Sequence, residues 1–324
     1  MEQCSDQCKK ELMVNISDRR TSGLGPTAPP AKPRPVLTRE EWLAKREERR
    51  ERQREQNLHR SAQMHAARIA FEATNTPEPQ NNLSEHHVGC SGWFYWHWRG
   101  RFYPDDIKTS DWFAHYAKQF NTVELNAPFY AWPTVGTVKT WIRQIGRRRF
   151  VYTVKASELI THVRRFSRTS DLVKDFALIA ELLGPAMGCF LFQLPPSFKY
   201  SRARLKRIVD QLDPRHRNVV EFRHRSWWND TVYAAFAEKG IIFCSCSGPR
   251  LPDALVKTAE DVYIRFHGTK QWYRHDYTRD ELKSWAGRVR DAKPVRVWAY
   301  FNNDREGYAI KNARAFLRLL RKPS

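Results

Sequence analysis

Five charged side chains interrupt the most apolar stretches of this 324-residue sequence: Glu124, Lys155, Glu221, Arg223 and Arg265. A charge in such a stretch is costly unless it pairs with an opposite charge or meets a ligand. Two glutamates in one pocket can serve as general acid and general base, and two arginines with a lysine can hold an anion. Structural ion pairs between these acids and bases are the alternative for each residue taken singly.

Further side chains that could do chemistry accompany these five. His162 and His267 are candidates for proton transfer because imidazole titrates near neutral pH. With the two glutamates they form the predicted catalytic set: Glu124, Glu221, His162 and His267. The predicted substrate-binding residues are Trp93, Asn126, Tyr130, Lys155, Gln193, Arg223, Trp227, Arg265, Asn302 and Asn303. Charged residues, histidines and aromatic rings gathered on one face favour a ligand-binding or catalytic site over separate ion pairs in the core.

Eight short runs rich in β-branched and aromatic residues carry these side chains near their C-terminal ends. The runs begin at residues 87, 121, 150, 188, 218, 240, 261 and 295. Apolar residues with helical spacing lie between them, except around 248–260, where the pattern favours a loop. Eight strand–helix units over 87–324 predict an α/β fold, a (β/α)8 TIM-like barrel with its site at the C-terminal strand ends. A doubly wound open sheet is the alternative, but GCSGWFYW lacks the G-x-G-x-x-G turn expected after its first strand.

Seven ordered motifs in this region resemble the YecE-like family, which is catalogued as a domain of unknown function. The motifs are GCSGWFYWHWRGRFYP, FNTVELNAPFY, TVKASELITH, LFQLPPSF, VVEFRHRSWW, VYIRFHG and YFNNDREGYAIKNA, and the match spans about 87–320. The resemblance implies a TIM-type barrel and a pocket lined by motif residues, but no reaction. The implied lining residues are Ser91, Gly92, Trp93, Glu124, Asn126, Tyr130, Lys155, Thr161, His162, Gln193, Pro195, Glu221, Arg223, Trp227, Arg265, His267, Gly268, Asn302, Asn303, Ala309 and Asn312. Where the family pattern has an acidic residue near the end of strand six, this sequence has CSCSG.

The residues before the barrel have a different character. Residues 1–36 include the Gly- and Pro-rich run TSGLGPTAPPAKPRP and are predicted to be a disordered tail. Residues 37–73 are predicted to form a charged helix that starts at a Thr38–Glu41 capping box, and 74–86 a linker. A solvated helix packed only by its last turns is one interpretation of 37–73. A docking arm for a protein or RNA partner is the other.

Positive charge is concentrated in the predicted barrel. The net charge is +21, with 15 Lys or Arg against 13 Asp or Glu before residue 86, and 41 against 22 from there on. Such an excess favours an anionic partner, either a small molecule or a nucleic acid. The basic clusters at 142–150, 162–168 and 201–207 could track phosphates, or could be ordinary solvated surface.

Several classes of protein are disfavoured by the sequence. No stretch approaches the roughly 18 apolar residues of a membrane span, and no targeting segment is evident, so we expect a cytoplasmic protein. Six cysteines are too few for a disulfide scaffold, and Cys244 with Cys246 are predicted to be buried thiols. No cofactor is specified. A divalent metal held by Glu124, His162, Glu221, His224 and His267 is a weaker alternative, because these residues lack local ligand spacing.

The charge and the polar strand ends together predict an enzyme, a hydrolase or lyase, that acts on an anionic phosphate-bearing substrate such as a nucleotide or nucleic acid. The predicted site is the C-terminal face of the barrel. Glycoside hydrolysis by the two glutamates is disfavoured, because the surrounding positive charge does not suit a neutral sugar. The alternative function is a non-catalytic nucleic-acid-binding module.

Overall fold

A computed structural model of the chain describes residues 38–74 and 84–321. It divides into two compact units, one up to Gln56 and one from Asn57 onward. The predicted tail at 1–36 and most of the predicted linker at 74–86 lie outside the described residues.

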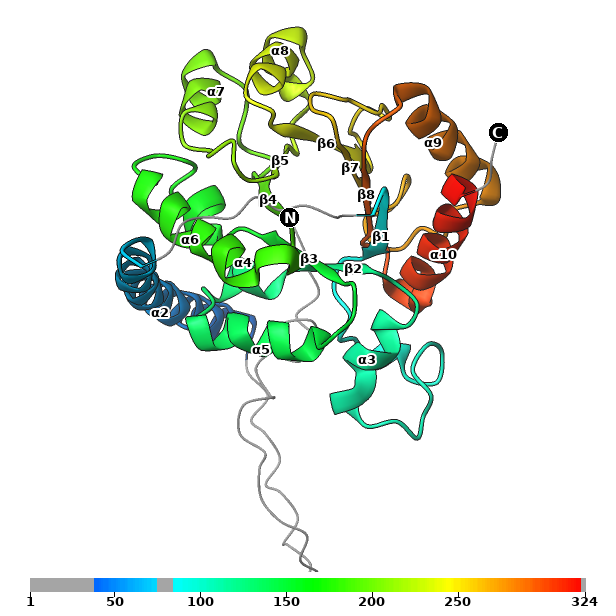
Figure 1. Ribbon diagram of the computed structural model, residues 1–324, viewed down its shortest axis with the longest axis horizontal. Helices are drawn as coiled ribbons and strands as arrows, with labels where there is room; N and C mark the ends of the chain where they lie inside the picture. The colour runs from blue at the N-terminus through cyan, green and yellow to red at the C-terminus, as the bar shows by residue number, and fades with distance from the viewer. Residues whose placement is uncertain (1–37, 75–83, 322–324) are drawn as a thin grey trace, which may run out of the picture. The chain divides into compact units, whose positions relative to one another are not determined.

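Eight parallel strands form the centre of the larger unit (Figure 1). They are β1 (His86–Cys90), β2 (Thr122–Leu125), β3 (Val151–Lys155), β4 (Met187–Gln193), β5 (Asn218–Glu221), β6 (Ile242–Ser247), β7 (Val262–Phe266) and β8 (Val297–Phe301). Their hydrogen-bonded order is β1-β8-β7-β6-β5-β4-β3-β2, so β1 and β2 are the two strands that meet to close the ring. The predicted TIM-like barrel is therefore confirmed, and the open doubly wound sheet is not observed.

Side chains close the seam between β1 and β2. The Tyr116 hydroxyl accepts a hydrogen bond from the Cys90 backbone N–H at 2.8 Å and lies 3.1 Å from the Thr122 carbonyl oxygen, to which it donates. The backbones approach so closely that a Cβ on Gly89 would lie 2.3 Å from the same carbonyl oxygen. Only glycine fits at this position. The Tyr116 hydroxyl takes the place of a direct backbone hydrogen bond between β1 and β2.

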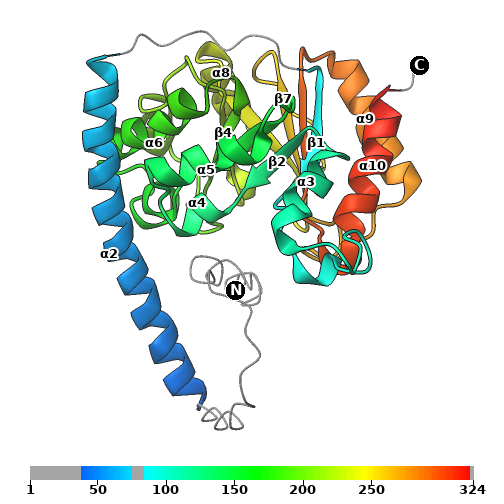
Figure 2. The same ribbon diagram turned by 60° about the horizontal axis from the view of Figure 1, so that its bottom comes forward.

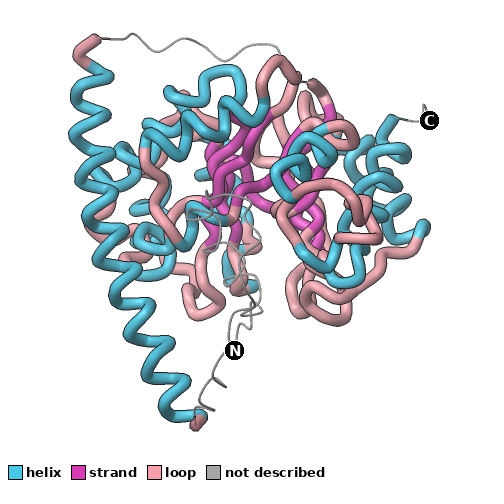
Figure 3. Tube along the Cα trace, turned by 90° about the horizontal axis from the view of Figure 1, so that it is seen from below, coloured by secondary structure: helices cyan, strands magenta, loops and turns pink. Residues whose placement is uncertain are grey.

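Helices surround the strands, and Figure 3 shows the strands between them. They are α3 (Trp112–Ala117), α4 (Ala127–Tyr130), α5 (Val135–Ile145), α6 (Ser170–Leu183), α7 (Arg202–Val209), α8 (Asp230–Glu238), α9 (Arg279–Ala292) and α10 (Tyr308–Arg321), with short helical turns at Trp96–Trp98, Thr109–Asp111, Leu159–Val163, Gly184–Ala186, Arg225–Trp227 and Arg305–Gly307. Helices α9 and α10 lie side by side, and α10 contacts β1 (Figure 2). The residues between β6 and β7 form a loop, as their sequence indicates.

Polar caps start the helices where the sequence offers them. The predicted Thr278–Glu281 capping box is present at α9, and Thr134, Ser201 and Asn229 cap α5, α7 and α8. Among the described residues, no helix has the length and apolarity needed to cross a membrane.

The interior of the barrel is filled in layers. Cys189, Leu191, Val219 and other apolar residues form one buried cluster, in which the Tyr300 hydroxyl lies within 2.8 Å of Thr122 and Thr153 hydroxyls. Side chains alternate along a strand, so the next inward positions toward the C-terminal ends are the polar residues noted in the sequence. The apolar layers thus form the floor beneath a polar barrel mouth.

Helix α2 (Arg39–Glu72) starts at the predicted capping box: the Thr38 N–H donates to the Glu41 carboxylate at 2.8 Å, and the Glu41 N–H to the Thr38 hydroxyl. Apolar spacing predicts packing only in its last turns. In the structure packing begins earlier, at Asn57, whose amide donates to the Tyr130 carbonyl and accepts from the Trp132 N–H. A buried polar anchor of this kind leaves no mark in the hydrophobic pattern.

Candidate active site at the barrel mouth

Four buried charges form a continuous chain across the mouth of the barrel. Arg265 on β7 donates to Glu124 on β2 and to Glu221 on β5, both at 2.5 Å. Glu221 also accepts from Nε of Arg223, whose side chain keeps 6% of its exposure. The ion pairs that the sequence left open as an alternative are therefore formed, and they alternate in sign from Glu124 to Arg223.

Both oxygens of Glu124 are occupied. Oε1 accepts from the Ser91 hydroxyl and from Arg265, and Oε2 accepts from the Tyr263 hydroxyl at 2.6 Å. The Ser91 oxygen in turn accepts from Arg265 at 3.0 Å and from the Asn126 amide at 2.9 Å. Because the hydroxyl then has no lone pair left, Ser91 orients Glu124 and is poorly placed to act as a nucleophile.

Glu221 and His267 are held in fixed protonation states. Burial alone would raise the pKa of Glu221, but Arg223 and Arg265, together with His267, hold it well below its usual value. Burial and the same two arginines lower the pKa of His267 well below its usual value. Its Nε2 lies 3.1 Å from Arg223 Nη2, and Asn302 Nδ2 lies 3.3 Å from its Nδ1. At neutral pH Glu221 is thus an anion and His267 a neutral ring.

Lys155 at the end of β3 differs from the other charges of the mouth. Its Nζ lies 4.1 Å from the centre of the Phe129 ring. It has no hydrogen-bond or ion-pair partner within 38–74 and 84–321, and the residue keeps 9% of its exposure. Burial, followed by the charge of Arg265, lowers the pKa of Lys155 to about 8. Its ammonium group therefore exchanges a proton close to neutral pH.

His162, like Lys155, contacts the ring of Phe129. Its ring packs edge to face on Phe129, with centroids 4.8 Å apart, and its Nδ1 lies 3.0 Å from the Thr161 hydroxyl. Burial and the charges of Lys155 and Arg223 lower the pKa of His162 to about 3. Like His267, this ring is neutral at physiological pH.

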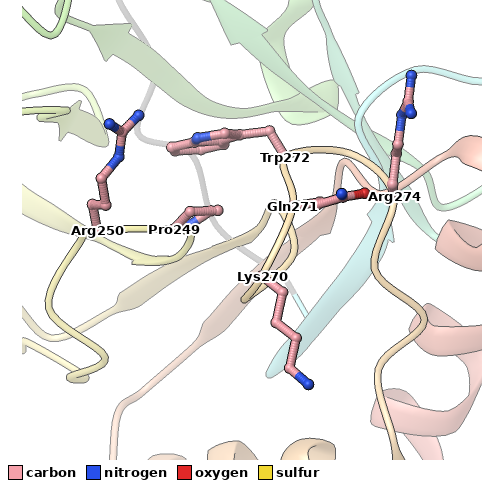
Figure 4. A pocket seen from close by; sticks show the side chains of 6 residues that line it. All are labelled: Pro249, Arg250, Lys270, Gln271, Trp272 and Arg274. Atoms are coloured by element: carbon pink, nitrogen blue, oxygen red, sulfur yellow. The ribbon is translucent and has the colours of Figure 1, made fainter.

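A pocket of about 480 Å³ lies in the loops that follow β6 and β7. Its lining residues are Pro249, Arg250, Lys270, Gln271, Trp272 and Arg274. In Figure 4 the Arg250 side chain and the Trp272 ring extend to the same side of Pro249, whereas Lys270 and Arg274 point in different directions. The three cations of this rim pocket have no acidic partner in the described part of the chain. The pocket is thus basic and carries one large aromatic surface.

Trp272 links the rim pocket to the chain of charges. The Arg223 guanidinium lies 4.4 Å from the centre of the Trp272 ring, and the His267 ring lies 5.3 Å from it. The loop can fold back over the mouth because residue 268 is glycine. Its φ is +102°, and a Cβ there would lie 2.4 Å from the Gln271 carbonyl oxygen.

The side chains of several residues predicted for the pocket are engaged by neighbours outside the chain of charges. Trp227 is fully buried in a stack between Phe198 and Phe222. Phe222 follows the inward-facing Glu221, so its side chain points outward from the barrel. The stack therefore lies in the layer between the strands and the helices. Asn303 donates to the His275 carbonyl and to Asn312. Trp93 packs on Phe113, Tyr130 packs on Phe129, and the Gln193 amide donates to the adjacent Leu194 carbonyl. Among the described residues, the side chains of Trp227, Asn303, Trp93 and Gln193 form no hydrogen bond or ion pair with the chain of charges.

Two parts of the mouth were missed from the sequence. Tyr263 lies two residues before Arg265 on the same face of β7, so strand alternation could have identified it. The rim pocket could not have been found in this way, because loop residues carry no periodicity that fixes their direction.

One group of side chains has the composition of a metal site. Ligand atoms of Glu221, Cys246 and His267 all lie within 4.8 Å of one another. Two of the three are already engaged by Arg223 or Arg265, and these guanidinium charges oppose the binding of a cation. His224, another ligand of the weaker alternative, instead lies 2.8 Å from the Ser226 hydroxyl. Cys244 and Cys246 are buried thiols, as predicted.

Comparison with known proteins agrees with this architecture. A family model described as "Protein of unknown function DUF72" matches residues 87–324. The chain belongs to the DUF72 family. The resemblance carried by the seven motifs is thereby confirmed, and the family description assigns no reaction.

Individual relatives are similar to this chain over part or most of the barrel. The UPF0759 protein YunF of Bacillus subtilis is 26% identical over 270 residues, which cover 72% of this chain and 94% of YunF. YecE of Escherichia coli is 32% identical over 110 residues, or 34% of this chain and 40% of YecE. A DUF72 crystal structure from Thermotoga maritima has 27% identity and a TM-score of 0.67, covering 74% of this chain and all of that one.

Proposed function

We propose that this protein is an enzyme that binds an anionic, phosphate-bearing substrate at the C-terminal face of its barrel. The observation that carries the proposal is the rim pocket, which Arg250, Lys270 and Arg274 line together with Trp272, and in which none of the three cations has an acidic partner among the described residues. Guanidinium and ammonium groups bind phosphate oxygens, and an indole face accepts a planar group such as a nucleobase. A nucleotide or a nucleic acid satisfies both requirements.

The chain of charges supports a catalytic site next to this pocket. Glu124, Glu221, Arg223 and Arg265 balance one another, so Lys155 adds one positive charge that no side chain in the described mouth neutralises. An anionic substrate would supply the missing charge. Arg223 lies between the two regions, since it contacts both Glu221 and the Trp272 ring.

Among these groups, Lys155 is the best candidate for proton transfer. Glu221 stays ionised and His162 and His267 stay neutral through the physiological range, whereas the pKa of Lys155 is about 8. A group with a pKa near the working pH transfers protons most effectively. Lys155 as the base, with Glu124 and Glu221 as its fixed electrostatic surroundings, suits hydrolysis or elimination on a phosphate-bearing substrate.

Calorimetric titration with pyrophosphate and with a nucleoside diphosphate tests the binding step. The triple variant Arg250→Ala, Lys270→Ala and Arg274→Ala should bind both ligands at least about tenfold more weakly, and its affinity should depend less on the salt concentration. The matched control replaces three exposed arginines, Arg147, Arg148 and Arg149, by alanine and should bind like the unmodified protein. Equal affinity in the rim variant and the unmodified protein would refute the proposal.

A non-catalytic nucleic-acid-binding module is the second candidate. It is favoured by the exposure of Arg147, Arg148 and Arg149 and of Arg164 and Arg165 on the surface. If the Arg147–Arg149 variant lost oligonucleotide binding while the rim variant kept it, binding would belong to the outer surface and this second function would be preferred.

A further inference from the structure

Lys155 is a buried amine without an acceptor. It lies at the end of β3 and faces into the mouth of the barrel, one strand repeat above Thr153, whose hydroxyl contacts Tyr300 in the floor. Phe129 covers one side of Nζ, and no oxygen of a described residue accepts a hydrogen bond from it. A protonated lysine loses its hydration here without compensation, whereas a neutral amine loses far less.

Charged groups face Lys155 from several packed elements. Arg265 on β7 and Arg223 beyond β5 disfavour its protonated form, while Glu221 on β5 and Glu124 on β2 favour it. His162, on the helical turn after β3, is neutral near physiological pH. Because the two arginines are tied to the two glutamates, neither carboxylate is free to turn toward Nζ and fix its proton.

We propose that Lys155 Nζ is a nucleophile that forms an imine with the carbonyl carbon of a phosphate-bearing aldehyde or ketone. The inference rests on the proposed function only for the phosphate; the amine chemistry depends on Lys155 itself. A neutral lysine in a desolvated pocket is the form that attacks carbonyl carbons. The residue keeps 9% of its exposure and ends β3 at the mouth, which is the side from which a carbonyl substrate would approach it.

The step balances without an oxidant or reductant. The nitrogen lone pair attacks the carbonyl carbon, the C–N bond forms, and one proton passes from nitrogen to the former carbonyl oxygen to give a carbinolamine. The C–O bond then breaks, and oxygen leaves as water with the second nitrogen proton. Uptake of one proton from solvent yields the iminium cation, whose positive charge is favoured by the nearby Glu221 and Glu124.

Reductive trapping tests this proposal on the full-length protein. Glyceraldehyde 3-phosphate and uncharged glyceraldehyde are used as probes, borohydride reduces any imine to a stable secondary amine, and mass spectrometry of the digest locates the adduct. Lys155→Arg and Lys155→Met are the test variants, and circular dichroism checks that each is folded. Lys257, an exposed lysine that donates to the Ala292 and Lys293 carbonyls, is the internal control.

We expect one dominant adduct, on Lys155, at least about tenfold more abundant than that on Lys257 at pH 7, because an exposed lysine is largely protonated there. Labelling should rise with pH through a midpoint near 8 and disappear in both variants. Labelling of Lys155 no faster than that of Lys257, or an unchanged adduct yield in folded Lys155→Met, would overturn the proposal.

The two probes separate this inference from the proposed function. If glyceraldehyde and its phosphate label Lys155 equally, and the rim variant changes neither, the imine proposal stands and the phosphate-binding proposal fails. If pyrophosphate binds and the rim variant weakens it, but neither probe modifies Lys155, the phosphate-binding proposal stands and the imine proposal fails.

Discussion

The ammonium nitrogen of Lys155 lies 4.1 Å from the ring centre of Phe129, and in the described part of the chain no carboxylate pairs with it. The four side chains of the neighbouring chain of charges, Glu124, Glu221, Arg223 and Arg265, are each tied to a partner of opposite charge. A cation facing an aromatic ring is stabilised far less than one that faces an acid. Lys155 is thus the one basic group of this constellation that is left open to a ligand or to loss of its proton.

Replacing Lys155 by methionine should stabilise the protein at pH 7. The substitution keeps most of the chain length and removes a buried charge whose partner is absent. Linkage gives the sign of the pH effect: the folded pKa of about 8 lies below the unfolded value of about 10.4, so the unfolded state binds more protons between them. Unfolding free energy of the unmodified protein should therefore rise over this window, and urea titrations at pH 7 and pH 10 should show the advantage of the variant shrinking.

His162 should weaken the fold in acid. The pKa of His162 is about 3 in the folded state and about 6.5 in the unfolded state. As the pH falls through this window, the unfolded state binds a proton and the folded state does not, so the free energy of unfolding falls. The expected loss is at most about 1.4 kcal/mol per pH unit. Comparing His162→Gln with the unmodified protein from pH 7 to pH 4 should give a shallower slope for the variant; parallel curves would argue against a neutral buried ring.

Glu221→Gln should be among the most damaging conservative substitutions. It removes the charge shared by Arg223 and Arg265 and leaves two buried guanidinium groups short of an acceptor, which costs about 3–5 kcal/mol for a buried pair. Glu306, paired with Arg101 at the surface, offers the matched control, and Glu306→Gln should change stability far less, because solvent screens an exposed pair. Equal small losses for both would mean that the buried chain contributes little.

The hydrogen bonds of Tyr116 between β1 and β2 should contribute to the stability of the barrel. Tyr116→Phe removes the hydroxyl that joins Cys90 to Thr122. The Cys90 N–H and the Thr122 carbonyl then lose their buried hydrogen-bond partner, at a cost of about 1–3 kcal/mol. Thermal unfolding compared with Tyr308→Phe, a partly exposed tyrosine at the start of α10, would measure it. A shift no larger than that of the control would show that β1 and β2 do not depend on this bridge.

Trp272→Ala should reduce the affinity for a nucleotide more than the affinity for pyrophosphate. Base stacking on an aromatic ring is worth about 1–3 kcal/mol, and pyrophosphate has no base to stack. Titration calorimetry with both ligands gives the comparison. An equal loss for the two would indicate that Trp272 acts only by holding Arg223 in place.

The barrel itself was predictable because strand and helix periodicities are local properties of the sequence. Charges that interrupt apolar strand runs also identified Glu124, Glu221 and Arg265 as site candidates, and the structure joins them in one network. The aromatic and amide residues that accompany this network were not predictable, because such a residue after a strand can turn either to the mouth or to the helices. Trp227 turned to the helices, while Trp272, in a loop without periodicity, reached the mouth.

An NMR titration of the lysine side chains tests the central claim most directly, with Nζ and Cε of Lys155 labelled isotopically and assigned through the spectrum of Lys155→Arg. A midpoint near pH 8 is predicted, well below that of the exposed lysines, with an increase when pyrophosphate is added because a bound anion favours the ammonium form. A midpoint near 10.4, unchanged by pyrophosphate, would contradict both the open amine and the anion site.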